Sequence, residues 1–432
     1  MSNELLLEQA DAAYAAGNLE TALRAYAGLI EKDDENVYAW YRTAVALSRL
    51  GDAESAAPSI EEAALALAEG GQLPLALAAL KDLERVDPQA SLRAATRVAE
   101  LYGVGSTRVA RRGPPPPRSV VSAGRAMVGD LRVVREMAAD RCEDLRALYS
   151  SKDGEPEHLP YHPLLSDLKP DDLASLVPLM ELRIYGAGES VVEQGEEGTS
   201  LFIVSRGVAA VKRDDVHLAY LRSGAFFGEM ALLTRQPRSA SVAAHEPLAL
   251  IEMGRDALED LARRKPEVAA VLADYTRQRL VRSLMATSPL FQPLDPPRRE
   301  ALLEMFESRV YESGQLVLSE GDVAEGLYVV LSGAVRVTKQ EGGESLALAV
   351  LEAGEVFGEI SLIQRREATA TVSADVKTVV LFLPRDAFNA HVGQFPEVLV
   401  HVFKLATERE QENSELMRVE PLALDDVENL LI

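Results

Sequence analysis

The sequence contains a single cysteine, Cys142, so no disulfide can form within the chain. Its six histidines show no spacing typical of metal ligands, and we expect no metal site. No apolar run is long enough to cross a bilayer, and the first residues show no signal-peptide pattern. These absences lead us to expect a protein of the reducing cytoplasm without a membrane span, in which Cys142 is a small core residue.

Basic residues are scarce relative to acidic ones. With 45 Lys and Arg against 68 Asp and Glu, the formal charge is −23. This charge argues against a surface that binds nucleic acid, because phosphate contacts need clustered cations. The patterns G-x-x-x-x-G-K-[ST], G-x-S-x-G and H-E-x-x-H are also missing, so we expect a protein that is not an enzyme. What the chain has in quantity is apolar residues, 47% of 432, enough for several packed domains.

Residues 1–103 are rich in Ala and Leu at helical spacing. The turn G-N-L at 17–19 recurs 34 residues later as G-D-A at 51–53. That is the period of tetratricopeptide helix hairpins, which this segment resembles. Stacked hairpins of that kind leave a concave groove, so the resemblance implies a groove for a protein partner. A helical cap that packs only on its own chain stays open as an alternative.

Residues 104–126 form a basic, proline-rich linker, with the run R-R-G-P-P-P-P-R at 111–118. Consecutive prolines make such a segment stiff and extended. Three interpretations stay open: a solvated linker, a strap that docks on an acidic surface, or a kinase inhibitor. The last arises because the first residues of the run resemble the inhibitor segment of protein kinase A regulatory subunits. Residues 127–155 then return to helical spacing and are expected to form a bridging helix.

From about residue 156 the pattern changes to short alternating strands separated by glycine, and this pattern occurs twice. The series that begins at Tyr185 returns 126 residues later at Tyr311, and helical sequence follows each copy. The expected fold class is therefore multi-domain α + β, with N-terminal helical hairpin repeats followed by two β-roll (jelly-roll) barrels that have flanking helices. The expected boundaries are 1–103 for the repeats, 104–126 for the linker, 127–155 for the bridging helix, 156–286 and 287–417 for the two barrel domains, and 418–432 for an acidic tail.

Residues 226–242 read F-F-G-E-M-A-L-L-T-R-Q-P-R-S-A-S-V and have the parts of a cradle for a phosphate. Gly228 lets backbone approach a ligand closely. The free N–H groups of the short helical turn that begins at Glu229 would point at an anion. Arg238 then adds a planar fork of donors that suits two phosphate oxygens.

This stretch resembles the phosphate-binding cassette of cyclic nucleotide-binding domains, which runs close to F-G-E-L-A-L, four spacer residues and P-R-A-A-T-V. The resemblance implies that Glu229 holds the ribose 2′-hydroxyl and that Arg238 holds the cyclic phosphate. It implies further contacts from the turn of Gly228, Met230 and Ala231, with Ser239 beside the phosphate. The implied ligand is cAMP or cGMP, of which cAMP is the commoner in the family.

In that family a helix after the barrel covers the base. At helical spacing in the matching segment, Tyr275 and Arg279 are the candidate covering residues.

The second copy of the cassette has lost its cation. Gly358, Glu359 and Ile360 keep the turn and the carboxylate, but Ala368 stands where the first copy has Arg238, followed by Thr369. A charged hydrogen bond to phosphate contributes ~1.5–3 kcal/mol, so its loss weakens binding about tenfold to a hundredfold. We expect this second site to be empty. The nearby arginines at 365 and 366 are close enough in sequence to reach in, but we expect one of them to pair with Glu359 or to face solvent.

Taken together, the sequence predicts a non-enzymatic cytoplasmic regulator or scaffold, and a homo-oligomer is possible. A cyclic nucleotide in the first barrel would reposition the helices of residues 255–286, and the helical repeats would pass the change to a protein partner. Two alternatives stay open. One is a structural assembly subunit whose barrels bind no ligand. The other is a regulatory subunit of a kinase that uses residues 108–118 as an inhibitor.

Overall fold

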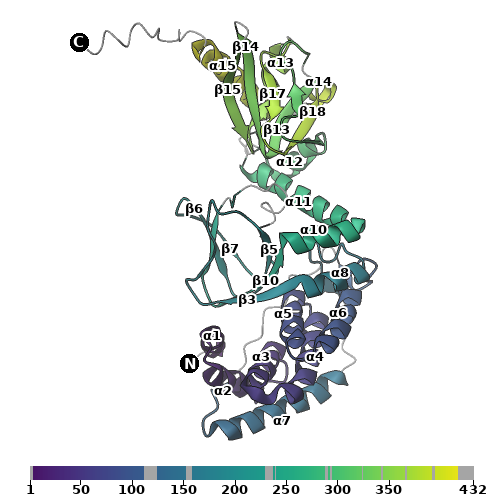
Figure 1. The fold of residues 1–432 in the computed structure, drawn as a ribbon, viewed down its shortest axis with the longest axis vertical. Helices are drawn as coiled ribbons and strands as arrows, with labels where there is room; N and C mark the ends of the chain where they lie inside the picture. Colours follow the sequence, from purple (N-terminus) through teal and green to yellow (C-terminus); the bar gives the residue numbers. More distant parts are fainter. Residues whose placement is uncertain are drawn as a thin grey trace, which may run out of the picture. The chain divides into compact units, whose positions relative to one another are not determined.

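The structure is a computed structural model that describes residues 3–110, 124–151, 158–228, 237–238, 240–287, 290–291, 294–323, 325–341, 344–364, 367–391 and 395–416. The chain forms two compact units, Met1–Thr276 and Arg277–Ile432. Each is described by itself below, with the elements labelled as in Figure 1.

Unit 1 begins with helices that each pack on the next one along the chain. They are α1 (Asn3–Ala15), α2 (Leu19–Ile30), α3 (Val37–Leu47), η1 (Ser48–Asp52), α4 (Ala53–Glu69), α5 (Leu73–Glu84) and α6 (Pro88–Tyr102). Side chains of Asn18, Asn36 and Asp87 accept hydrogen bonds from the first free N–H groups of α2, α3 and α6. The expected helical N-terminal domain is thus present, while its assignment to tetratricopeptide repeats stays a prediction.

The segment after these helices folds back along them. Helix α7 (Leu131–Ser150) packs on α4, α3 and α2. Arg135 forms an ion pair with Asp52 at 2.7 Å, and the Tyr149 ring stacks on Trp40 at 5.3 Å. Strand β1 (Val109–Ala110) pairs in parallel with β2 (Leu159–Pro160). The proline run at 111–118 lies outside the described residues.

The rest of unit 1 is a β-roll, here called barrel 1. Its sheets have the strand orders β3-β10-β5-β8 and β4-β9-β6-β7, and all pairings are antiparallel. The elements are α8 (Pro170–Leu176), η2 (Val177–Leu179), β3 (Met180–Tyr185), β4 (Ser190–Val192), β5 (Ser200–Arg206), β6 (Ala209–Arg213), β7 (Val216–Leu221), β8 (Phe226–Phe227), β9 (Ser241–Ala244), β10 (Leu248–Gly254), α10 (Arg255–Arg264) and α11 (Pro266–Thr287), the last of which continues into unit 2. Apolar side chains of both sheets fill the space between them, among them Phe202 and Phe227 of the first sheet and Val242 of the second.

Unit 2 repeats this architecture as barrel 2, with strand orders β11-β18-β13-β16 and β12-β17-β14-β15. The matching orders confirm the two related barrels that the sequence predicts. The elements are α12 (Pro296–Leu303), β11 (Glu307–Tyr311), β12 (Leu316–Leu318), β13 (Gly326–Ser332), β14 (Ala334–Glu341), β15 (Glu344–Glu352), β16 (Val356–Phe357), α13 (Glu359–Gln364), β17 (Thr371–Ala374), β18 (Thr378–Pro384), α14 (Arg385–His391) and α15 (Pro396–Leu416).

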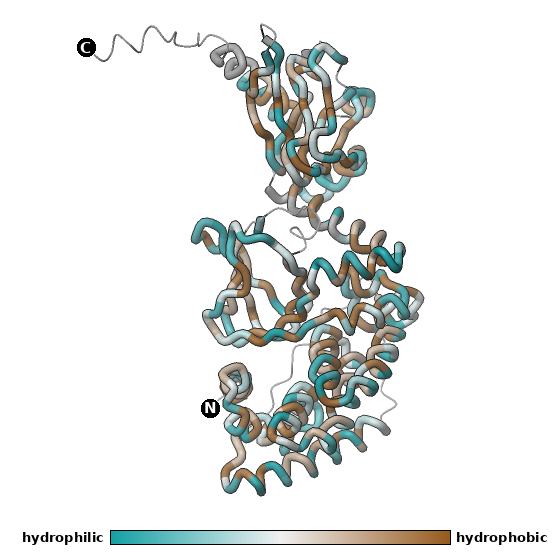
Figure 2. Tube along the Cα trace, in the orientation of Figure 1, coloured by the Kyte–Doolittle hydropathy of each residue, from teal (hydrophilic) through white to brown (hydrophobic). Residues whose placement is uncertain are grey.

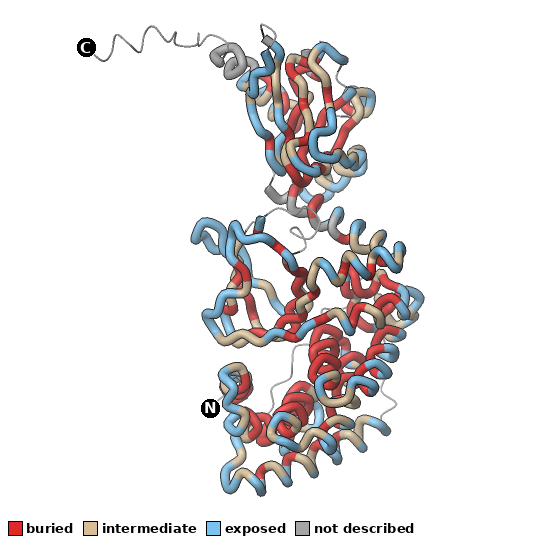
Figure 3. The backbone as a smooth tube through the Cα atoms, in the orientation of Figure 1, coloured by how far each residue is buried: buried red, intermediate tan, exposed pale blue. Residues whose placement is uncertain are grey.

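Hydrophobic residues are spread through the helices and strands of both units (Figure 2), and the buried ones concentrate in α3–α6 and in the central strands (Figure 3). Strand β7, at the end of its sheet, is exposed along most of its length. Among the described helices, none combines the length and the apolarity needed to cross a bilayer.

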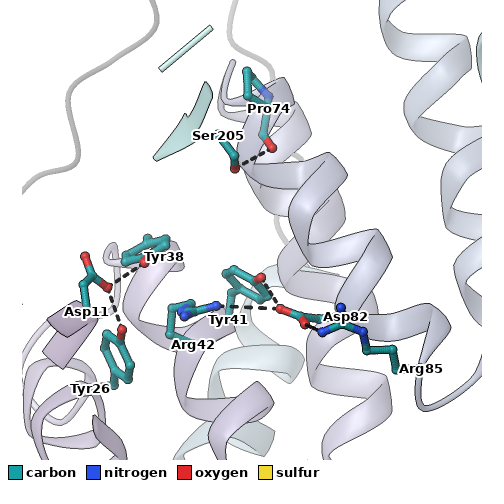
Figure 4. A network of polar contacts seen from close by, with 9 residues as sticks. All are labelled: Asp11, Tyr26, Tyr38, Tyr41, Arg42, Pro74, Asp82, Arg85 and Ser205. Carbon is teal, nitrogen blue, oxygen red and sulfur yellow. Dashed lines mark hydrogen bonds and ion pairs between the residues drawn. The ribbon is translucent and has the colours of Figure 1, made fainter. Parts of the chain in front are cut away.

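Within unit 1 the helices and barrel 1 share one hydrophobic core and a partly buried polar joint. Asp11 of α1 accepts hydrogen bonds from the hydroxyls of Tyr26 and Tyr38 at 2.6 and 2.7 Å (Figure 4). Its other oxygen accepts from Arg206, the last residue of β5, at 2.7 Å. Beside it the Ser205 hydroxyl donates to the Pro74 carbonyl of α5 at 2.8 Å. The end of strand β5 is therefore fastened to the helical domain.

Arg206 and Tyr38 of this joint each keep one protonation state. Burial lowers the pKa of the Arg206 guanidinium, but the charge and hydrogen bond of Asp11 together with the nearby tyrosine hydroxyls outweigh burial, so this pKa ends above its usual value. Burial, and after it the charge of Asp11, raises the pKa of the Tyr38 hydroxyl. Arg206 therefore stays charged and Tyr38 stays a donor across the physiological pH range.

A second contact, between helix α6 and the segment that leads into barrel 1, makes unit 1 sensitive to acid. His162 is buried, with its ring 5.7 Å from that of Tyr102 in α6, and its Nε2 has no hydrogen-bond partner in the described part of the chain. Burial lowers the pKa of His162 from 6.5 to about 4. Between these two values His162 is protonated in the unfolded chain but neutral in the folded chain. The stability present above pH 6.5 is therefore lost as the pH falls toward 4.

We expect the free energy of unfolding of unit 1 to fall by about 1 kcal/mol per pH unit between pH 6 and 4 because of this histidine alone. The His162→Leu variant, which cannot titrate there, should have a shallower slope than the wild type. Urea unfolding followed by the fluorescence of Trp40, the single tryptophan of the chain, measures both slopes. Identical slopes would show that His162 takes up its proton equally well in the folded chain.

Candidate functional site

The guanidinium of Arg238 is the best-defined part of the first cassette. Arg238 is only 8% exposed. Its Nη2 donates to the carbonyl of Ser200 in β5 at 3.0 Å, and its Nη1 donates to the carbonyl of Gly228 at 3.1 Å. The ring of Phe202 lies 5.7 Å from the guanidinium carbon and stacks on Phe227 at 4.9 Å. Barrel 1 thus holds a permanent positive charge in a fixed orientation next to Gly228.

The backbone around this arginine explains why the sequence has glycine at 228. Gly228 follows β8 and has φ +85°, a conformation that side chains disfavour. A Cβ atom there would lie 2.6 Å from Arg238 Nη1 and 2.7 Å from the Ser200 carbonyl oxygen. Arg238 is placed by its own backbone, whose N–H donates to the Glu196 carbonyl at 2.7 Å. Only a residue without a side chain lets the guanidinium reach this position.

Most of the other predicted residues of the first site are not described by the structure. Glu229, Met230, Ala231 and Ser239 lie outside the described residues, and so does the side chain of Arg279. Their predicted roles stay predictions.

Tyr275 is described, and it is buried against Phe226 with the ring centres 5.5 Å apart. Phe226 belongs to the core that barrel 1 shares with the helices, whereas Phe227 points into the barrel. Successive residues of a strand face opposite sides, so Tyr275 packs on the outer side of β8. To cover a base it would have to leave that contact.

The second cassette keeps the frame of the first without its cation. The Ala368 N–H donates to the Asp322 carbonyl at 2.7 Å, the same backbone contact that places Arg238. Gly358 has φ +84°, and a Cβ atom there would lie 2.7 Å from the Gly326 carbonyl oxygen. Where barrel 1 presents a guanidinium, barrel 2 therefore presents the methyl group of Ala368.

The carboxylate of the second cassette has a partner that sequence reasoning missed. Glu359 is 2% exposed, and its Oε1 accepts a hydrogen bond at 3.0 Å from Nη1 of Arg409 in α15. The same nitrogen also donates to the Val356 carbonyl. One signal could have found this pair: Arg409 follows Arg279 by 130 residues, the offset between the two cassette glutamates. The arginines at 365 and 366 themselves lie outside the described residues.

Beside this pair lies a pocket of about 270 Å³. Strands β12, β14, β15 and β17 and the cassette turn form its walls. It is lined by Leu318, Val337, Leu348, Ala349, Val350, Leu351, Glu355, Phe357, Gly358, Glu359, Ile360, Ser361, Ala368, Thr369, Ala370, Val372 and Arg409. The predicted residues of the second site thus surround a real cavity, whose wall is mostly aliphatic. In the described residues no group of three His, Cys, Asp or Glu side chains could hold a metal ion.

Comparison with known proteins identifies both barrels. Residues 182–265 and 308–394 each match the family model of the cyclic nucleotide-binding domain. The chain is 31% identical over 253 residues to the cAMP-dependent protein kinase regulatory subunit of Yarrowia lipolytica, across 58% of this chain and 62% of that protein. It is 30% identical over 232 residues to the cGMP-dependent protein kinase egl-4 of Caenorhabditis elegans, across 53% of this chain and 29% of that protein.

Among solved structures, the regulatory domain of Toxoplasma gondii PKA with cAMP is 24% identical to this chain. The alignment covers 57% of this chain and 92% of that one, with a TM-score of 0.29. Because that score is low, the fold assignment rests on the strand orders of this chain.

The chain therefore contains two cyclic nucleotide-binding domains in tandem, similar to those of the regulatory subunits of cAMP-dependent protein kinase. It spans less than two thirds of the length of these curated relatives.

Proposed function

We propose that the chain is a non-enzymatic signalling regulator that binds a cyclic nucleotide in barrel 1 and passes the change on to a protein partner. The observation that carries this proposal is the guanidinium of Arg238, buried and aimed beside the glycine turn of a matched cyclic nucleotide-binding domain. The resemblance assigns the ribose to Glu229 and the remaining phosphate contacts to Met230, Ala231 and Ser239. cAMP is the favoured ligand, because several of the matched relatives are named for cAMP.

Binding has a defined physical basis at this arginine. Its guanidinium donates to two neutral carbonyl oxygens, those of Ser200 and Gly228. A cyclic phosphate offers charged acceptors, and charge-assisted hydrogen bonds are roughly twice as strong as neutral ones. The phosphate therefore competes well with these two carbonyls, and it weakens their hydrogen bonds to Arg238.

Strand β5 gives the signal a physical connection to the helical domain. Its first residue, Ser200, carries one of those carbonyls, and its last, Arg206, is fastened to Asp11 of α1. A ligand that changes the contacts at one end of β5 can alter the packing at the other, provided that it favours one arrangement over another. Because α5 packs on β3, β5 and β10, that face of the helices is covered by the chain's own barrel. A partner would use a different face.

The relatives favour one alternative. Several are named as regulatory subunits of cAMP-dependent protein kinase, so a kinase catalytic chain is the partner class that this comparison suggests. In that case residues 108–118 would serve as the inhibitor. Co-purification of a kinase with the full chain, lost when residues 111–118 are deleted, would favour this alternative over a scaffold.

Isothermal titration calorimetry of the full chain with cAMP and with cGMP tests the proposed function. We expect saturable binding of at least one of the two, with close to one site per chain. Absence of heat from both nucleotides, together with an unchanged melting temperature at saturating concentrations, would refute the sensor and leave the ligand-free assembly subunit.

A further inference from the structure

The pocket of barrel 2 has the features of a working ligand site, although the sequence predicts an empty one. Its volume is about 270 Å³, which about nine water molecules would occupy in the liquid, so it can hold an organic molecule. Its wall is largely made of aliphatic side chains, with a few polar groups at one end. Ligand sites typically combine an apolar wall with a few placed polar groups.

The polar end of the pocket has one carboxylate oxygen that is available to accept a hydrogen bond. Glu359 is 98% buried and lines the pocket, and its Oε1 accepts from Arg409. Among the described residues, no hydrogen bond to its Oε2 is present. A carboxylate can only accept, so the group that this oxygen calls for is a donor such as a hydroxyl. Arg409 pairs with the first oxygen of the carboxylate and leaves this second position unfilled.

The charges around the pocket exclude an anion. Two carboxylates, Glu355 and Glu359, line it against the single guanidinium of Arg409, which lies 3.8 Å from the first and 3.0 Å from the second. The position of the phosphate-binding arginine is occupied by Ala368, preceded by the exposed Glu367. Burying a phosphate here without a free cation would be strongly unfavourable.

We propose that the pocket of barrel 2 binds an uncharged nucleoside. A sugar hydroxyl donates to Oε2 of Glu359, and the ring system of the base lies against the aliphatic wall. A cyclic nucleotide without its phosphate is a nucleoside, and barrel 2 is a matched cyclic nucleotide-binding domain with Ala368 in place of the cation for the phosphate. This inference concerns a different site from Arg238, so either proposal can fail without the other.

Calorimetric titration of the full chain with adenosine and with guanosine tests the inference. We expect one of them to bind with about one site per chain, and to bind equally well to the Arg238→Ala variant. Glu359→Gln removes the charged acceptor and should weaken binding about tenfold or more. Ala349→Trp places a large ring in the pocket from an exposed position and should abolish binding.

The matched control is Ala347→Trp, an exposed position on the same strand that does not line the pocket. This variant should bind like the wild type, and melting temperatures check that every variant folds. The proposal is overturned if neither nucleoside binds at about 1 mM, the weakest affinity that such a titration measures. It is also overturned if Arg238→Ala abolishes binding, or if Ala349→Trp folds and binds normally.

Discussion

Replacing Arg238 with alanine is expected to abolish measurable binding of cAMP to barrel 1. The variant loses two charge-assisted hydrogen bonds to the phosphate, each contributing ~1.5–3 kcal/mol, so the affinity should fall by at least about a hundredfold. In Arg238→Lys the charge remains but the planar fork is lost, and binding should be partly retained. Calorimetric titration with cAMP measures the affinity of the wild type and of both variants.

Two controls separate this effect from a general loss of structure. Arg213→Ala removes an exposed arginine at the β6–β7 turn of the same barrel and should leave the affinity unchanged. Arg238→Ala also leaves the carbonyls of Ser200 and Gly228 without their donor, so its melting temperature should be recorded alongside. A folded Arg238→Ala variant that binds cAMP as tightly as the wild type would remove this residue from the site.

Introducing arginine at position 368 is expected to give barrel 2 a cyclic nucleotide site. Ala368 has the backbone hydrogen bond of Arg238, and Gly358 and Gly326 occupy the places of Gly228 and Ser200. A new guanidinium should therefore reach the matching carbonyls and face the cassette turn. We expect a gain of about tenfold to a hundredfold in the affinity of barrel 2 for cAMP.

Stoichiometry is the readout for this variant. Ala368→Arg should raise the number of cAMP molecules bound per chain from about one to about two, and the second should remain when Arg238→Ala is combined with it. Ala368→Met adds length without charge and should leave the stoichiometry at one. If Ala368→Arg folds and still binds a single cAMP, the missing cation is not what separates the two barrels.

The two barrels could be predicted because their signals are local. The strand pattern is repeated, and each copy lies within a short stretch of sequence. The glycines at 228 and 358 mark turns that need a positive φ, and the structure has φ angles of +85° and +84° there. The loss of the cation at Ala368 could be read off by aligning the chain with itself.

Contacts between distant segments could not be predicted in this way. Asp11 and Arg206 are 195 residues apart. Neither the helical pattern nor the strand pattern predicts which face of the helical domain packs on barrel 1. Arg409 is 50 residues from Glu359 in a helix where many charged residues face solvent. Helical spacing makes Tyr275 a candidate covering residue, but spacing alone does not reveal that it is buried against Phe226.

A crystal structure of the full chain grown with cAMP tests the central claim most directly. The account predicts density for one cyclic nucleotide in barrel 1, with the phosphate within hydrogen-bond distance of the Arg238 guanidinium, and no cyclic phosphate beside Ala368. A structure grown at saturating cAMP would contradict the account if barrel 1 held no ligand and Arg238 still donated to the carbonyls of Ser200 and Gly228.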